Sequence, residues 1–361
     1  MTAPSPKATI LGIKPYQAGK AKAAGFASPI KLSANENALG CSPLARAAYI
    51  EAANSLHLYP DPQGVALREA IALKHDLDPA RIVLGAGSDE IFALVCQAYL
   101  SPGDNMVQPQ FAFAAWAIAA KAAGASVRSA AERNFHVDVD AILAEVDAAT
   151  RVVFVANPAN PTGTLIPFAE IERLHRALPQ NVVLVLDGAY AEFAEHRVDY
   201  EDGLRLARTA PNVVLTRTFS KLHGLAALRV GWGYAAAPIV DALNRIRLPF
   251  NTCTGGQIAA VAALKDEAFA VRSLAHVCEG LPPLERVLSR AGFRTLPSAT
   301  NFVTALAPTS EDAQACERGL AVRGILVRGL ANYDMANALR VTVGDAQQMR
   351  ALEAALREIR P

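Results

Sequence analysis

The sequence predicts an α/β fold in which a mainly parallel central sheet is covered by helices on both sides. Short apolar runs without polar alternation are typical of strands that are buried on both faces. Alanine-rich stretches such as 91–100 and 168–178 separate these runs and repeat apolar residues at helical spacing. The alternation of strands and helices indicates a parallel sheet. The predicted strands are 81–85, 104–109, 151–156, 182–187 and 212–216.

The character of the chain changes after about residue 249, where proline and glycine break the pattern at 248–257. A helical region extends from there to about Leu288, followed by short strand candidates and a final helix. This order indicates a second, smaller α+β domain, and 361 residues suffice for two domains. The strand candidates are 301–306, 324–328 and 339–344. The predicted division is an N-terminal arm with the first part of the small domain at 1–49, a large domain at 50–248 and a small C-terminal domain at 249–361.

Composition narrows the classes of function. The net charge of +1 provides no basic field for nucleic acid or an anionic membrane. The N-terminus lacks a leader pattern, and no stretch approaches the roughly 18 apolar residues of a membrane span, so we expect a cytoplasmic protein. The five cysteines show no C-x-x-C spacing and the histidines form no H-E-x-x-H motif, which argues against a disulfide framework and a metal site.

Two charged residues stand where predicted strands run out. Asp187 ends V-V-L-V-L-D, and Lys221 follows N-V-V-L-T-R-T-F-S-K, with Arg229 eight residues later. Sites in parallel sheets lie at the carboxyl ends of strands. Pyridoxal phosphate needs an amine for a Schiff base, a carboxylate for its pyridine nitrogen and a cation for its phosphate. Each residue alone would be an ordinary cap or surface charge, but together they predict a pyridoxal-phosphate enzyme.

The segment 81–92 predicts a strand, a glycine turn and the start of a helix. Glycine lets the backbone approach an anion, and the free amides of a helix N-terminus favour phosphate. A dinucleotide fold is the competing interpretation, but its G-x-G-x-x-G motif would need glycine at position 90, which is Glu90. We therefore expect Ala86, Gly87 and Ser88 to cradle one phosphate.

The string N-P-A-N-P-T-G at 157–163 follows another predicted strand. Two prolines and a glycine make a rigid turn, from which Asn160 can donate a hydrogen bond to the cofactor's phenolic oxygen. A purely structural turn would use the same residues, so both interpretations stay open here.

These motifs resemble a known family. G-A-G-S-D-E, N-P-A-N-P-T-G, L-D-G-A-Y-A-E-F and T-F-S-K-L-H-G-L-A-A-L-R are similar to class II aminotransferases of fold type I. S-A-N-E-N-A-L-G-C-S-P, L-Y-P-D-P-Q-G-V-A-L-R, R-T-F-S-K and the late G-I-L-V-R resemble more closely the histidinol-phosphate aminotransferases. The resemblance covers nearly the whole chain and implies the fold of pyridoxal-phosphate-dependent transferases of type I.

The resemblance also implies a role for each matching residue. Lys221 would form the Schiff base, Asp187 would pair with the pyridine nitrogen, and Asn160 and Tyr190 would hold the phenolic oxygen. Ser220, Arg229 and the 86–88 loop would bind the phosphate, with Phe111 on the ring. Tyr59 would reach the cofactor of the partner subunit in a homodimer. Arg340, with Arg328 nearby, would bind the substrate's anion, and Tyr16 would close the site from the arm.

Two positions depart from the family pattern. Relatives commonly have Asp-Glu before Ala-Tyr, whereas Gly188 follows Asp187 here. The cofactor contact should survive, but whatever the glutamate orders is absent or replaced. Phe111 stands where many relatives have tyrosine, which removes a hydroxyl and keeps the stacking face.

The activity that the resemblance implies is transamination between a small amino donor and a keto acceptor. Glutamate would become 2-oxoglutarate, and imidazole acetol phosphate would become histidinol phosphate, as in histidine biosynthesis. An aromatic amino-acid aminotransferase would use the same cofactor residues and the same Arg340, and a phosphothreonine-type decarboxylase is a weaker alternative. A regulator built on this fold would need an added DNA-binding segment, which the sequence does not contain.

Overall fold

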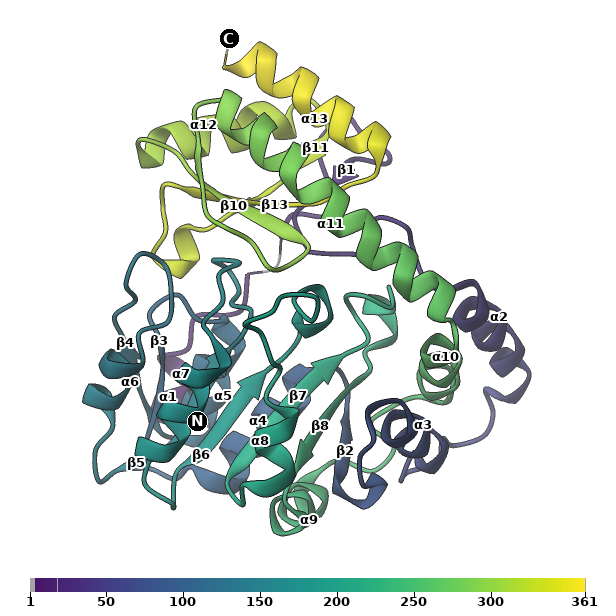
Figure 1. The fold of residues 1–361 in the computed structure, drawn as a ribbon, viewed down its shortest axis with the longest axis vertical. Coiled ribbons are helices and arrows are strands. Elements are labelled where there is room, and N and C mark those ends of the chain that lie inside the picture. Colours follow the sequence, from purple (N-terminus) through teal and green to yellow (C-terminus); the bar gives the residue numbers. More distant parts are fainter. Residues whose placement is uncertain (1–3, 18, 361) are drawn as a thin grey trace.

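The computed structural model describes residues 4–17 and 19–360 (Figure 1). Its centre is a seven-stranded sheet of order β2-β8-β7-β6-β5-β3-β4. All neighbouring strands are parallel except β8, which runs antiparallel to both β2 and β7. This mixed, largely parallel sheet with flanking helices confirms the predicted fold class. The strands are β2 (Ile82–Gly85), β3 (Asn105–Pro109), β4 (Ser126–Ala130), β5 (Thr150–Ala156), β6 (Val183–Asp187), β7 (Val213–Thr218) and β8 (Gly231–Ala235).

Helices cover both faces of this sheet because successive strand residues point to opposite sides. Leu184 and Leu186 pack in one apolar cluster, whereas Val183 and Val185 pack in another. The first cluster contains α2 (Pro43–Ala52), α3 (Val65–His75), α6 (Val139–Glu145), α7 (Phe168–Ala177), α8 (Leu204–Thr209) and α10 (Thr254–Lys265). The second contains α4 (Ser88–Tyr99), α5 (Ala114–Ala123) and α9 (Ala237–Ile246).

Two strands of the sheet, β4 and β8, were not predicted from the sequence. β4 (S-V-R-S-A) is an edge strand whose side chains are mostly exposed or half-buried, so it carries no apolar run. β8 (G-W-G-Y-A) contains two glycines, which weaken a strand pattern. Their purpose is close packing: a Cβ on Gly231 would lie 2.3 Å from the amide nitrogen of Ser88, and one on Gly233 would lie 3.3 Å from Ile91.

A second, smaller body lies above the large sheet (Figure 1). Its antiparallel sheet has the order β12-β13-β10-β9, and the short β1 pairs with β11. The predicted strand at 324–328 divides at Val327 into β11 and β12, which belong to different sheets. The elements of this body are β1 (Ile30–Lys31), α11 (Glu267–Arg290), β9 (Arg294–Thr295), β10 (Phe302–Leu306), α12 (Ser310–Ala321), β11 (Ile325–Leu326), β12 (Arg328–Gly329), β13 (Ala338–Thr342) and α13 (Ala346–Ile359). The arm helix α1 (Ala8–Leu11) instead contacts α5 of the large body.

The division into 1–49, 50–248 and 249–361 stays a prediction. α10 follows residue 248, yet Ala259 and Ala260 of this helix pack in the same apolar cluster as the large sheet. α2 does the same through Ala45. This packing favours a boundary at the start of α11. Among the described residues, no helix is both long and apolar enough to cross a membrane.

Candidate active site

The candidate site is a cavity of about 490 Å³ at the carboxyl ends of β6 and β7. Its wall also includes residues of the arm and of the small body's sheet. Parallel sheets place their sites at this edge, as expected from the ends of the predicted strands. Ten of the residues singled out in the sequence line the cavity, namely Tyr16, Ser88, Asn160, Asp187, Tyr190, Ser220, Lys221, Arg229, Arg328 and Arg340.

Asp187 is the last residue of β6 and lies opposite Thr216 in β7. The Ala189 amide and the Thr216 hydroxyl donate to its Oδ1 over 3.0 and 3.4 Å. Both bonds reach the same oxygen, which leaves Oδ2 available to a donor in the cavity. Burial raises the pKa of Asp187 to about 7, because a carboxylate loses its hydration there. A cationic N–H group placed against it would stabilise the charged form.

Lys221 lies three residues beyond the end of β7 and faces Tyr190 across the cavity. Its Nζ lies 5.6 Å from the centre of the Tyr190 ring. Burial, aided by the charge of Arg340, lowers the pKa of Lys221 to about 8. A substantial fraction of the amine is therefore neutral near physiological pH, as a nucleophile or a base requires.

An anion site lies where α4 begins. Its N-cap is Gly87, which has a φ of 78° and provides no side-chain cap for the helix. Arg229 Nη1 donates to Ser220 Oγ over 3.2 Å, and Nη2 pairs with Asp89 over 3.2 Å. A Cβ on Gly87 would lie 2.2 Å from that Nη2, so this approach requires glycine. Uncapped amides, a hydroxyl and a guanidinium together suit a phosphate.

The 86–88 loop is only partly as predicted. Ser88 lines the cavity, but Ala86 and Gly87 do not. The Ala86 amide donates to Glu90 Oε2 over 2.5 Å and is therefore already paired within the chain. Gly87 contributes by its lack of a side chain, and not as a wall of the cavity.

Two buried arginines face each other in the small body's sheet. Arg328 and Arg340 are only 8% and 7% exposed and are direct cross-strand partners in β12 and β13. Arg328 donates to the Gln17 carbonyl of the arm, and Arg340 donates to Asn160 Oδ1, each over 2.5 Å. Like charges opposite each other on neighbouring strands destabilise a sheet. An anion in the cavity beside them would relieve this repulsion.

Phe111 is not among the residues that line the cavity, and its position on the cofactor ring stays a prediction. Phe111 stacks on Phe135 at 5.5 Å, and its amide is held by Glu132 Oε1 at 3.1 Å in the turn after β3. Phe113, two residues further on, lines the cavity and packs edge-on against Tyr16.

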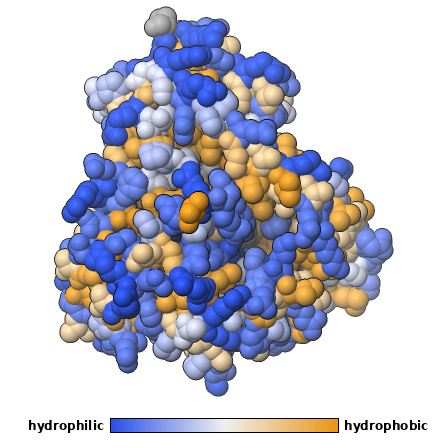
Figure 2. Space-filling view, viewed as in Figure 1, coloured by the Kyte–Doolittle hydropathy of each residue, from blue (hydrophilic) through white to orange (hydrophobic). Residues whose placement is uncertain are grey.

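Tyr59 also lies outside its own subunit's cavity. It is 82% exposed and stacks on Phe250 at 4.6 Å. Apolar side chains gather on the same side of the molecule, around α2 (Figure 2). The exposed residues there include Tyr49, Ile50, Leu56 and Leu58.

Several residues of the wall were not singled out in the sequence. Asn35 Nδ2 donates to the Tyr190 hydroxyl over 2.7 Å, and burial raises the pKa of that phenol to about 12. Lys31 pairs with Glu36 over 2.7 Å at the cavity. Asn35 and Glu36 belong to the motif S-A-N-E-N, and Lys31 precedes it by two residues. The motif was noted as a family signature without roles for its members.

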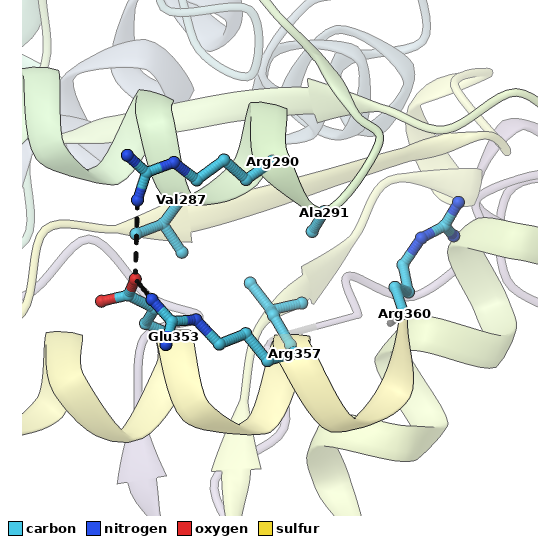
Figure 3. Close-up of a pocket in the computed structure, with 7 residues that line it drawn as sticks. Val287, Arg290, Ala291, Glu353, Arg357 and Arg360 are labelled. Carbon is cyan, nitrogen blue, oxygen red and sulfur yellow. Dashed lines mark hydrogen bonds and ion pairs between the residues drawn. The ribbon is translucent and has the colours of Figure 1, made fainter.

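Two other hollows between described residues lack this chemistry. Figure 3 shows one of about 40 Å³ between α11 and α13, where Arg290 and Arg357 both pair with Glu353, at 3.8 and 2.6 Å. A neighbouring hollow of about 450 Å³ includes Cys316, but burial raises the pKa of that thiol to about 11. Neither offers a reactive amine beside a buried carboxylate.

Comparisons with known proteins agree with the geometry. The family model for aminotransferase class I and II matches residues 27–356. Histidinol-phosphate aminotransferase 1 of Caulobacter vibrioides is 53% identical and covers 96% of this chain and 97% of its own. The histidinol-phosphate aminotransferase of Maricaulis maris is 47% identical, with 97% of both chains covered. The crystal structure of histidinol-phosphate aminotransferase from Sinorhizobium meliloti in complex with pyridoxal-5'-phosphate is 28% identical, with a TM-score of 0.91, and covers 99% of this chain and 98% of that one.

The matched range includes nearly all the described chain and every strand of both bodies. The resemblance of the motifs is therefore confirmed by the family model, the relatives and the fold. The chain belongs to the class I and II aminotransferases.

Proposed function

We propose that this chain is a pyridoxal-phosphate-dependent aminotransferase that interconverts histidinol phosphate and 2-oxoglutarate with imidazole acetol phosphate and glutamate. The observation that carries the proposal is the buried pair Arg328 and Arg340 in the same cavity as Lys221. A substrate with a reactive amine and a strongly anionic group would meet both features. The high identity to histidinol-phosphate aminotransferases over nearly whole chains supports this substrate class.

The residues present fit pyridoxal phosphate. Asp187 has a carboxylate oxygen available for the ring nitrogen, and the Gly87 turn, Ser220 and Arg229 form a phosphate cradle that a Cβ would fill. Asn160 keeps its amide nitrogen for the phenolic oxygen, because its Oδ1 accepts from Arg340. When bound, the cofactor supplies an electron sink for the substrate's α-carbon.

Each residue then has a separate task. Lys221 binds the cofactor through its amine and, once released, carries a proton to and from the substrate's α-carbon. Asp187 keeps the ring nitrogen protonated, and its own charged form is stabilised in return. Tyr190, held by Asn35, donates to the phenolic oxygen from a fixed position. Tyr16 and Phe113 limit the access of water from the arm side.

Arg328 and Arg340 bind the substrate's anion. A guanidinium meets a carboxylate or a phosphate through two parallel hydrogen bonds, so the same pair serves glutamate and histidinol phosphate. Arg328 Nη2 also donates to the Gln17 carbonyl of the arm, so an anion held by this guanidinium would lie beside the arm.

The decisive experiment compares kcat/KM for histidinol phosphate, histidinol and phenylalanine, each with 2-oxoglutarate as acceptor. We expect histidinol phosphate to be preferred to histidinol, and Arg340→Ala to remove most of that preference. Arg245→Met serves as control, because this exposed arginine pairs only with Asp241 on α9. A much higher kcat/KM for phenylalanine would instead identify an aromatic amino-acid aminotransferase, which is the alternative.

The proposal includes a homodimer in which Tyr59 completes the partner's phosphate site. Tyr59 is exposed and distant from its own cavity, and a contiguous apolar surface around α2 is typical of an interface. An isologous dimer would bury this surface twice. We also propose a cytoplasmic location, which suits five cysteines that are all free thiols.

A further inference from the structure

A buried arginine that has no part in the reaction so far lies directly behind the site. Arg217 is 2% exposed and belongs to β7, one residue after the partner of Asp187 and four before Lys221. Its guanidinium pairs with Glu192 at 3.1 Å, with Glu195 at 2.8 Å and with Asp202. A guanidinium can be buried only if such partners compensate its lost hydration.

All three carboxylates come from one segment, 192–202, which begins just after Tyr190. Only the short 3-10 helix η3 (Ala191–Phe193) gives this segment regular structure, and residues 195–199 are exposed. Its far end is held by Tyr200, whose hydroxyl donates to the Asn157 carbonyl over 2.9 Å. The Arg217 cluster is thus the main polar link between this segment and β7.

Gly188 makes room for the arginine. A Cβ at position 188 would lie 3.3 Å from Arg217 Cδ, 3.4 Å from Nε and 3.0 Å from the Thr216 carbonyl oxygen. Its backbone is not in the left-handed region, so the lack of a side chain, and not its conformation, distinguishes it. The Arg217 side chain therefore lies alongside position 188 with no side chain between them.

We propose that Arg217 is a positioning residue for amino transfer: with Glu192 and Asp202 it holds the end of β7, and therefore Lys221, in register with Tyr190. The inference rests on the proposed transamination. The segment cannot move from β7 without leaving a buried charge unpaired, which is strongly unfavourable. Lys221 and Tyr190, which meet across the cavity, are thereby kept at a fixed separation.

The test compares Arg217→Met and Arg217→Lys in the holoenzyme at saturating pyridoxal phosphate. We expect Arg217→Met to lower kcat on the order of 100-fold, the effect of misplacing reacting groups by about 1 Å, with KM nearly unchanged. The primary isotope effect with α-deuterated glutamate should rise, because proton transfer by Lys221 becomes the slow step. Amide hydrogen exchange over 191–202 should become faster. Arg217→Lys should recover part of kcat but not all, since one ammonium cannot pair with three carboxylates as a guanidinium does.

Arg205→Met is the matched control. Arg205 is an exposed arginine of the same region that also pairs with two carboxylates, Glu172 and Glu201. It should change neither kcat nor the isotope effect. A fall of kcat in Arg217→Met that only follows the fraction of folded protein, with an unchanged isotope effect, would overturn the proposal. If Arg217→Met does not fold, kcat and the isotope effect of Arg217→Lys and Glu192→Gln provide the test instead.

A second comparison tests the partners of Arg217. Glu192→Gln should lower kcat because one partner is lost. An unchanged kcat in that variant would overturn the proposal. Glutamate serves as donor throughout, so a failure of histidinol phosphate as substrate would leave this test intact.

Discussion

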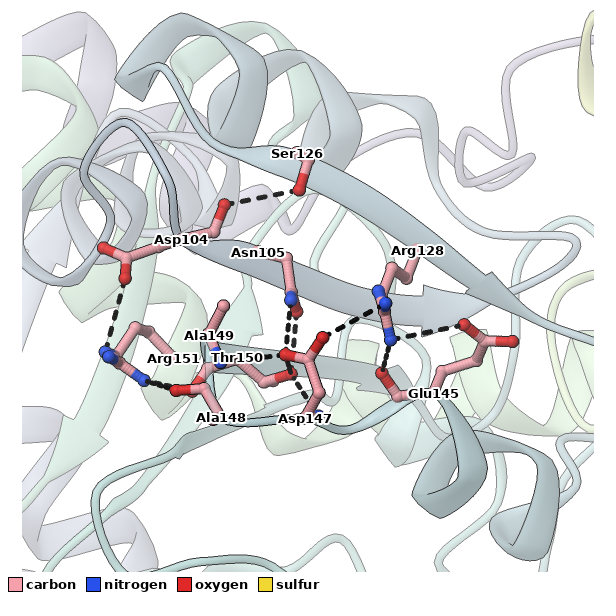
Figure 4. Close-up of polar contacts among 10 residues, drawn as sticks. All are labelled: Asp104, Asn105, Ser126, Arg128, Glu145, Asp147, Ala148, Ala149, Thr150 and Arg151. Carbon is pink, nitrogen blue, oxygen red and sulfur yellow. Dashed lines mark hydrogen bonds and ion pairs between the residues drawn. The ribbon is translucent and has the colours of Figure 1, made fainter.

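The two edges of the large sheet differ in how well their charged side chains are paired. At the amino edge, polar side chains at the starts of β3, β4 and β5 pair with one another (Figure 4). At the carboxyl edge, charged side chains are buried around a cavity. The same sheet thus has a stable polar network at one edge and a set of poorly compensated charged groups at the other.

Asp147 is typical of the amino edge. It accepts hydrogen bonds from Asn105 and from the Ala149 amide, over 2.8 and 2.9 Å, and pairs with Arg128 at 3.1 Å (Figure 4). The bond from Asn105, followed by that from Ala149, lowers the pKa of Asp147, so its charged form is favoured. These hydrogen bonds and the ion pair join groups of the protein itself and need no bound ligand.

Asp187 and Lys221 are typical of the carboxyl edge. Burial raises the pKa of the acid to about 7 and lowers that of the amine to about 8, so both charged forms are disfavoured. Perturbed groups of this kind cluster at functional sites because a ligand completes their interactions. Charged groups at the amino edge thus stabilise the folded chain, whereas those at the carboxyl edge are placed to interact with a bound cofactor.

The largest expected effect is at Lys221. Lys221→Ala should retain pyridoxal phosphate bound through Arg229 and Ser220 but lose transamination, because Lys31, the other lysine of the cavity wall, is held in an ion pair with Glu36. Borohydride reduction followed by peptide mapping should label Lys221 in the wild type. Arg128→Met at the amino edge is the control and should keep full turnover. Label on another lysine would contradict the assignment.

The next effect is at Asp187. Asp187→Asn should slow transamination at least about a hundredfold, because an amide cannot hold the ring nitrogen protonated. Single-turnover absorbance changes with glutamate measure this step. Asp147→Asn is the same chemical change at the other edge and should leave the rate unaltered. A near-normal rate in Asp187→Asn would mean that this carboxylate only caps a strand.

A smaller effect is expected at Tyr59, and it tests whether the cofactor site of one subunit needs a residue of the other. Tyr59→Ala should weaken cofactor binding, and Lys221→Ala should abolish turnover. If Tyr59 acts across the interface, both defects fall in one site of a mixed dimer. Equal mixing should then restore roughly a quarter of wild-type activity at limiting cofactor, since about half of the dimers have one good site of two. Activity no greater than the sum of the separate variants would contradict the exchange.

The smallest effects concern stability, and they differ in sign between the edges. Because the folded pKa of Asp187 is raised, its contribution to the free energy of unfolding falls as the pH rises from about 4 to 7. Asp187→Asn should therefore stabilise the cofactor-free protein at pH 8, by at most about 4 kcal/mol, with no gain below pH 4. Asp147→Asn should destabilise it at pH 8 and have little effect in acid, where the lowered pKa no longer contributes. Urea unfolding at pH 4 and pH 8 measures both, and equal signs would refute the contrast.

The sequence predicted most of the carboxyl edge because local patterns encode it. An apolar run that stops at Asp187, and another that stops before Lys221, place both residues at strand ends, whatever the rest of the chain does. Ser88 and Arg229 were found for the same reason, since a glycine turn and a short spacing are visible in one segment.

What escaped prediction depends on tertiary packing. The arginine pair Arg328 and Arg340 was expected only as neighbours, and the cross-strand register that opposes their charges is not local. Phe111 and Phe113 are both aromatic and two residues apart, so only the turn after β3 decides which one reaches the cavity. Arg217 was quoted in the motif R-T-F-S-K but was given no role, because its three partners lie 15 to 25 residues upstream in an irregular segment.

The antiparallel strand β8 determines when, during folding, the protein can bind its cofactor. Arg229 comes two residues before β8, and its partner Asp89 lies 140 residues earlier, beside the helix start against which Gly231 packs. The phosphate cradle therefore requires a long loop to close, a contact that forms slowly in folding. A nascent chain on the ribosome cannot capture its cofactor from β2 and α4 alone. Cofactor binding would thus report that the last strand has entered the sheet.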